Sequence, residues 1–226
     1  MDLANLTPLE QLRAGRLPRR LTQLLVGLVL YGVSMAMMVR GALGLDPWDV
    51  LHYGVATHLP LTLGQVVIVT GVLVLLLWIP LRQMPGLGTV ANAILVGLAT
   101  DATLAVLGAA AGMPGRVALM LGGVVLNALA TAMYIGSQFG PGPRDGLMTG
   151  LVRRTGWSVR LVRTVLEVSV VAVGWLLGGV AGIGTIVYAL GIGPLVQLML
   201  PYFTVSVSRA PQRQAGVRTA ARPARR

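Results

Sequence analysis

Carboxylates are the side chains of this sequence whose type and spacing could do chemistry. Only seven residues are acidic, and two of them, Asp46 and Asp49, flank a proline in the stretch GLDPWDVLHYG at 44–54. A related stretch, GPGPRDGLMTG at 140–150, carries Asp145 at the equivalent place, 96 residues later. Carboxylates in an apolar setting suit a proton, a cation or a cationic group on a solute. Asp49 and Asp145 are therefore candidates for a substrate or ion path.

Helix initiation explains the same motif without any ligand. Pro47 and Pro143 each suit the first position of a helix, where the missing N–H leaves no bond unmade. Asp46 would then be the N-cap, and Asp49 would lie at N3 beside the positive end of the helix dipole. Such a carboxylate contributes about 0.3–1 kcal/mol. Capping and ligand binding both remain open for these aspartates.

Three other charged residues are further candidates for the path. Arg144 has no counterpart in the first stretch, where Trp48 stands, and could neutralise Asp145. Glu167 lies near the middle of an apolar stretch, with Arg163 four residues earlier on the same helical face. The two form either a structural ion pair or a substrate or proton site. His52 and His58 have no copies in the second stretch, and we expect both at the membrane interface.

Composition places the chain among membrane proteins. Of its 226 residues, 55% are hydrophobic and 11% charged, outside the range of soluble proteins. With no cysteine, two histidines and no HExxH or GxSxG motif, the sequence predicts no metal site, no cofactor, no catalytic residues and no enzyme activity. All eighteen basic residues are arginine, mostly near the two ends. No aromatic residues are interleaved in the C-terminal arginines, so anionic lipid headgroups are the expected partner and not nucleic acid.

Six stretches are long and apolar enough to cross the bilayer: about 21–40, 61–81, 88–108, 117–137, 158–178 and 184–204. The arginine distribution predicts that both termini lie in the cytoplasm of a bacterial cell, with the chain passing repeatedly through the plasma membrane.

An internal repeat organises these stretches. At an offset of 96 residues, Gly44, Pro47, Asp49, Leu51 and Gly54 match Gly140, Pro143, Asp145, Leu147 and Gly150. Each copy holds three spans, an odd number, so the second copy would enter the membrane inverted. The predicted fold is all-α, with a basic segment at 1–20, repeats at 21–108 and 117–204, and an Arg-rich tail at 205–226.

Each repeat also contains a short helix after its first span, at about 47–59 and 143–154. Both are too short to span, so each either dips into the membrane and returns or lies on its surface.

Glycines mark a second repeated motif. Gly86 and Gly88 precede a threonine, as do Gly182 and Gly184. We interpret them as sharp connections that let helix starts pack closely, because phosphate binding would need a strand-to-helix setting.

The stretches GLDPWDVLHYG, LWIPLRQMPGLGT, GPGPRDGLMTGLVRRTG and GIGTIVYALGIGPLVQ together resemble the YczE/YitT group of bacterial integral membrane proteins, and the YczE-like branch most closely. The resemblance covers nearly all of 20–204 and implies a plasma-membrane protein, without a settled substrate. Aquaporin-type channels share only the architecture of inverted repeats with two half-helices.

The leading hypothesis from the sequence is a small-solute transporter or exporter with a path between the repeats. Its rival is a non-transporting accessory protein that supports a biosynthetic or export complex. In both, the partners are the lipid bilayer and its anionic headgroups, and a homo-oligomer is compatible with either. The transporter additionally needs an unknown small solute.

Overall fold

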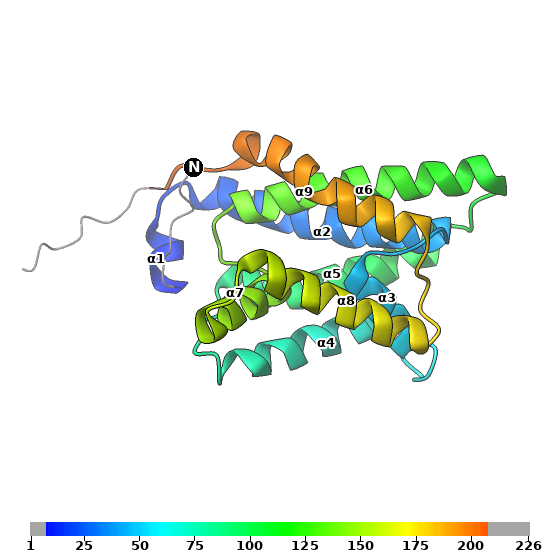
Figure 1. Cartoon of the computed structure of the whole chain (residues 1–226). Helices are drawn as coiled ribbons and strands as arrows, with labels where there is room; N and C mark the ends of the chain where they lie inside the picture. Colours follow the sequence, from blue (N-terminus) through cyan, green and yellow to red (C-terminus); the bar gives the residue numbers. More distant parts are fainter. Residues whose placement is uncertain (1–7, 208–226) are drawn as a thin grey trace, which may run out of the picture.

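The chain folds into a bundle of α-helices (Figure 1). A computed structural model describes residues 8–207, and within that range it contains helices and no strands. The helices are α1 Pro8–Arg13, α2 Leu17–Gly41, α3 Pro47–Ala56, α4 Leu63–Trp78, α5 Leu87–Val106, α6 Gly112–Gly136, α7 Pro143–Thr155, α8 Val159–Leu176 and α9 Ile183–Phe203. Within the expected basic segment 1–20, the described part holds α1 and the start of α2, while most of the Arg-rich tail lies outside the described residues.

Four helices are long and apolar enough to cross a membrane: α2, α5, α6 and α9. This makes the protein a multi-pass membrane protein. Two of the six expected spans correspond to weaker candidates. Helix α4 has only 16 residues, about 24 Å of helix. Helix α8 has 18 residues but carries Arg160, Arg163 and Glu167.

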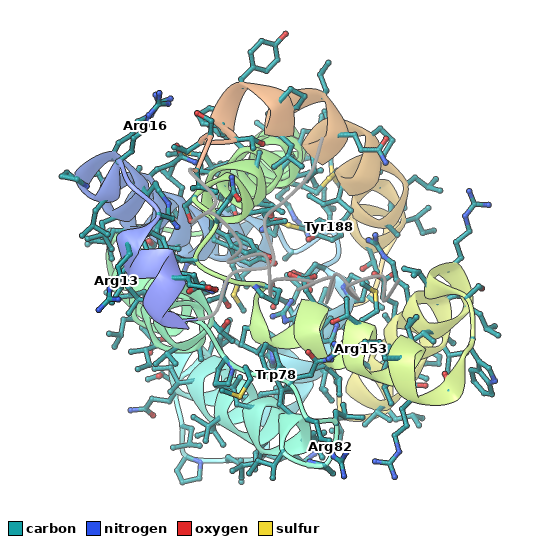
Figure 2. All side chains as sticks on the ribbon, turned by 90° about the vertical axis from the view of Figure 1, so that its left-hand side faces the viewer. Arg13, Arg16, Trp78, Arg82, Arg153 and Tyr188 are labelled. Carbon is teal, nitrogen blue, oxygen red and sulfur yellow. The ribbon has the colours of Figure 1, made fainter. Side chains whose placement is uncertain are left out.

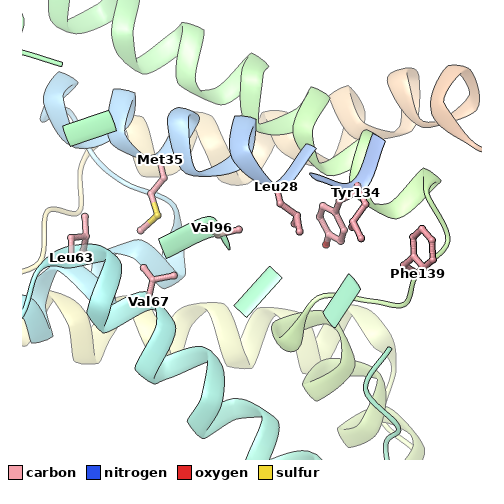
Figure 3. Close-up of a cluster of buried hydrophobic side chains, with 8 residues drawn as sticks. Leu28, Met35, Leu63, Val67, Val96, Tyr134 and Phe139 are labelled. Carbon is pink, nitrogen blue, oxygen red and sulfur yellow. The ribbon is translucent and has the colours of Figure 1, made fainter. Parts of the chain in front are cut away.

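Packing is centred on α2, which lies against both α5 and α6. Its side chains Leu24, Leu28 and Met35 are buried together with side chains from three other helices (Figure 3). Those partners are Leu63 and Val67 of α4, Val96 of α5 and Tyr134 of α6, with Phe139 from the following loop. Around this core, α6 packs on α9, α3 on α8, and α4 on both α5 and α7.

The short helices begin where the sequence predicts. Helix α3 starts at Pro47 with Asp46 as its N-cap, whose Oδ1 accepts a hydrogen bond of 2.8 Å from the backbone N–H of Asp49. Helix α7 starts at Pro143 with Gly142 at the cap. Their lengths are 10 and 13 residues, so neither spans a bilayer.

Two equivalent arginines hold the loops that lead into these short helices. Arg20 is fully buried and donates to the carbonyl oxygens of Ser137 at 2.8 Å and Gln138 at 2.9 Å. Arg116, which is 96 residues later, donates to the carbonyl oxygens of Gly41 at 2.9 Å and Ala42 at 2.6 Å. The acceptors are also 96 residues apart, so one clamp occurs twice, each time reaching from the start of one long helix to the end of another.

The loops that lead into α3 and α7 also pack against the Gly-x-Gly-Thr segments. The N–H of Gly88 donates to the carbonyl of Phe139 at 2.8 Å, and that of Gly184 donates to the carbonyl of Leu43, also at 2.8 Å. A side chain at Gly86 would collide with Phe139, one at Gly182 with Leu43, and one at Gly184 with Gly44. These glycines therefore allow close packing at helix starts, as their pattern indicates.

Positive charge among the described residues is concentrated at one end of the bundle. Arg13, Arg16, Arg82 and Arg153 all lie at the end that faces the viewer in Figure 2. Arg40 and Arg116 lie toward the opposite end, near the C-terminus of α2, where both donate to backbone carbonyls. The two arginines at that end are thus held by the fold.

Candidate functional site

A cavity of about 330 Å³ lies where α3 and α7 begin, and both Pro47 and Pro143 line it. Helices α4 and α5 form one wall through Val67, Gly71, Asn92 and Val96. The opposite wall comes from α8 and α9, through Arg163, Glu167, Tyr188 and Ile192, which are the residues 96 positions later. The walls thus use equivalent positions, but the charged side chains belong to the second one.

Arg144 joins the two short helices at the cavity. Its Nη2 lies 3.2 Å from Asp49 Oδ1, and its Nη1 lies 3.5 Å from Asp46 Oδ2. The guanidinium also stands 5.3 Å from the centre of the Trp48 ring, within the range of a cation–π contact. The expectation that Arg144 neutralises its neighbour Asp145 is therefore replaced by a pairing with the other short helix.

Asp49 is buried behind the cavity and does not line it. Only 2% of its side chain is exposed, and its Oδ1 lies 3.1 Å from His52 Nδ1 as well as near Arg144. His52 is equally buried, so its expected place at the interface is wrong, whereas His58 is exposed. Among the two repeated aspartates, Asp49 positions Arg144 and only Asp145 faces the cavity.

Asp145 is held by an aromatic hydroxyl. Tyr134 of α6 donates a hydrogen bond of 2.6 Å to Asp145 Oδ2. Both residues line the cavity, together with Tyr31 of α2, whose ring meets Tyr134 edge to face at 6.4 Å between centroids. One oxygen of the Asp145 carboxylate is thus engaged by the protein at the cavity wall.

Asp46 presents a buried oxygen without a hydrogen bond. Its Oδ1 caps α3, but its Oδ2 has no hydrogen-bond partner and has Arg144 Nη1 at 3.5 Å as its paired cation. Asp46 Oδ2 is therefore a buried acceptor that the protein leaves without a hydrogen-bond donor, next to the Arg144 cation.

Glu167 and Arg163 form the ion pair that their spacing indicates, with Arg163 Nε donating to Glu167 Oε1 at 2.8 Å. The Arg163 side chain is 48% exposed and that of Glu167 29%, so both lie at the mouth of the cavity and not in its depth. Being exposed, the pair contributes little to stability.

A hydrogen-bonded chain fixes the α9 wall. The Tyr188 hydroxyl donates to Asn127 Oδ1 at 3.0 Å, and Asn127 Nδ2 donates to Ser34 Oγ at 2.9 Å. Tyr188 therefore links α9 to α6 and α2, on the side of α9 that faces the middle of the molecule (Figure 2).

Sequence reasoning missed three residues of this site: Asp46 as a cavity residue, His52 as a partner of Asp49, and Tyr134 as the donor to Asp145. A signal existed only for Asp46, since an aspartate at an N-cap uses one oxygen and leaves the other free. Within residues 8–207, no three His, Cys, Asp or Glu side chains group as metal ligands.

Comparison with known proteins gives a family and no activity. Residues 18–201 match the model of a family of unknown function, DUF6198. The chain is 38% identical over 177 residues to an uncharacterized protein of Haemophilus influenzae, covering 78% of this chain and 81% of that one. It is 33% identical over 184 residues to the uncharacterized membrane protein YczE of Bacillus subtilis, covering 80% and 86%. No solved structure matches.

Proposed function

The chain belongs to the YczE-like family of unknown function DUF6198, and we propose that within the plasma membrane it transports a small solute along a path between two inverted repeats. The observation that carries this proposal is the cavity at which α3 and α7 both begin. A helix start turned toward a cavity from each half of the chain is the arrangement that many transporters use at their substrate site.

Structural equivalence at 96 residues supports the inverted repeat. Arg20 and Arg116 hold corresponding loops. The N–H groups of Gly88 and Gly184 donate to corresponding backbone carbonyls in those loops. Helix pairs correspond too: α2 packs on α5 as α6 does on α9, and α3 packs on α8 as α7 does on α4. In this proposal α3 and α7 are re-entrant half-helices, because each starts at the shared cavity.

The charge of the site favours a proton or a cationic solute. Asp46, Asp49 and Asp145 oppose Arg144, and each helix N-terminus adds the equivalent of about half a positive charge. The cluster therefore carries about one negative charge in surplus when the aspartates are ionised, while Arg163 and Glu167 neutralise each other at the mouth.

Orientation follows from the arginines. In this proposal the end of the bundle with Arg13, Arg16, Arg82 and Arg153 faces the cytoplasm. The C-terminal arginines lie outside the described residues, and we expect them to meet anionic headgroups on the same side. This role needs no cofactor and no enzymatic step.

A flux measurement tests the proposal. Purified protein is reconstituted in liposomes that contain a pH-sensitive dye, and small cationic and zwitterionic solutes are added outside. We expect saturable flux of at least one solute, with at least tenfold less in Asp145→Asn and in the Asp49→Asn, Asp145→Asn double variant. A solute that the double variant carries as well as the wild type contradicts the assigned role of these carboxylates.

The accessory-protein alternative makes a different prediction. It expects no flux for any solute and a stoichiometric partner on affinity purification from the native membrane. The cavity with an unsatisfied carboxylate oxygen at Asp46 favours the transporter, because an accessory protein has no need to keep such a group buried.

A further inference from the structure

Asp46 Oδ2 is the acceptor of the cavity that lacks a hydrogen-bond donor. The Asp46 side chain is 2% exposed and lines the cavity, yet this oxygen receives no hydrogen bond. Leaving a buried acceptor without a donor is unfavourable, and more so for a charged group. Arg144 Nη1 lies 3.5 Å from this oxygen without a hydrogen bond, so a donor carried by a ligand in the cavity would satisfy it. The Asp145 carboxylate lines the same cavity.

Two arginines also line the cavity: Arg144 is paired with Asp46 and Asp49, and Arg163 with Glu167. Most of the remaining lining is apolar or aromatic. Val74, Leu166 and Val196 contribute aliphatic surface, and Trp48 and Tyr188 contribute rings. A volume of about 330 Å³ is at the lower end of small-molecule sites, which run from about 300 to 1,000 Å³. The site is therefore large enough for a compact organic molecule and too apolar in its walls to favour a bare hydrated ion.

The packing of the helices around the cavity indicates that it opens between α8 and α9, because that pair is the less tightly packed of the two walls. On the other wall, α4 and α5 are sealed, because Gly64 and Gly97 pack backbone to backbone and Gly71 contacts Ala93. The residues 96 positions after Gly64 and Gly71 are Arg160 and Glu167, which are too large for such contact.

Gly193, the counterpart of Gly97, accordingly has no atom within 4 Å of the position that its side chain would take. Among the helices that the structure describes, α8 and α9 do not form a closely packed pair. Exposed apolar side chains stand on both helices, with Val168 62% and Leu190 73% exposed. The opening therefore lies on a face suited to lipid.

We propose that this cavity binds a small organic cation with a protonated amine and an apolar body, which enters between α8 and α9. The amine donates to Asp46 and Asp145, and the apolar body lies against the aliphatic and aromatic wall. This assignment rests on the proposed transport function, because it names the substrate class of the same cavity.

Binding is tested with the full chain in detergent micelles by calorimetry, using 2-phenylethylamine and butylamine as probes. Matched controls are 2-phenylethanol, which is neutral, and 3-phenylpropionate, which is an anion. We expect both amines to bind at least tenfold more tightly than either control. Equal binding of all four compounds, or no binding of either amine, overturns the proposal.

Asp46→Asn isolates the carboxylate charge, because asparagine still caps the helix. We expect at least a tenfold loss of amine affinity. Asp101→Asn is the matched control, since that carboxylate caps α4 at Gly64 N with a 2.8 Å bond and does not line the cavity. Equal effects of the two substitutions overturn the role of Asp46.

Gly193→Leu tests the route, because leucine is a better helix former than glycine and fills the open space. We expect amine association to slow at least tenfold, while Leu190→Trp on the exposed face leaves the rate unchanged. An unchanged rate in Gly193→Leu overturns the route.

Binding and transport can fail separately. Amine binding without amine flux in liposomes supports the binding site and rejects transport. Flux of another solute without amine binding supports transport and rejects the amine site.

Discussion

At the scale of single residues, the contacts of one charged side chain decide its role more than its type does. Arg19 and Arg20 are neighbours in the sequence, yet Arg19 is exposed and Arg20 is fully buried. Arg20 donates to three carbonyl oxygens and lies 4.2 Å from the centre of the Phe139 ring. It thus fixes the loop that leads into α7, and with it the position of Arg144.

Arg20→Lys is therefore expected to destabilise the protein. A lysine cannot reproduce the fork of N–H donors, so buried carbonyls lose their partners at about 1–3 kcal/mol each. The unfolding temperature in detergent should fall by several degrees, whereas Arg19→Lys, the matched control, should leave it unchanged. Equal unfolding temperatures for the two variants would show that the clamp contributes nothing.

At the scale of elements, the two repeats differ in how tightly their last two helices pack. Gly97 of α5 and Gly193 of α9 are the same residue at equivalent positions, but only Gly97 meets a neighbouring backbone. The difference arises in the partner helix, where Gly64 of α4 corresponds to Arg160 of α8. The glycine in α4 therefore lets α4 and α5 pack closely, whereas the arginine in α8 leaves α8 and α9 apart.

This asymmetry makes a prediction with a built-in control. In Gly97→Ala the new methyl group collides with the Gly64 carbonyl, and such overpacking costs about 1–3 kcal/mol. In Gly193→Ala the methyl group meets no atom, and the gain in helix propensity is up to about 1 kcal/mol. The thermal unfolding temperature should fall in Gly97→Ala and rise in Gly193→Ala. A fall of the same size in both would mean that α8 and α9 are packed like α4 and α5.

At the scale of the whole molecule, the orientation in the membrane is the property that can be tested most directly. The chain has no cysteine, so a single introduced cysteine labels without background. Trp157→Cys lies in the connection between α7 and α8, at the arginine-rich end, and Ala109→Cys lies between α5 and α6, at the other end.

In intact cells a membrane-impermeant maleimide should label Ala109→Cys and not Trp157→Cys. Both should label after the cells are opened, which controls for access to the thiol. The reverse pattern would place the arginine-rich end outside and contradict the orientation that we propose.

Local chemistry let the sequence determine a good part of this structure. Proline and a capping residue start a helix from within a few positions, so α3 and α7 begin at Pro47 and Pro143 as predicted. The Gly-x-Gly-Thr segments were interpretable for the same reason, because a missing side chain permits close approach wherever the neighbour comes from. Membrane residence follows from composition alone.

Only the tertiary structure decided which carboxylates line the cavity and which are buried behind it. Asp46 and Asp49 are three positions apart, and nothing in the sequence indicates that the first faces a cavity while the second is sealed behind it. Arg144 pairs with that distant stretch and not with Asp145 beside it, because side chains that are adjacent in a helix point in different directions. Contacts across 95 residues depend on how the helices pack, and helix packing is set by the whole chain.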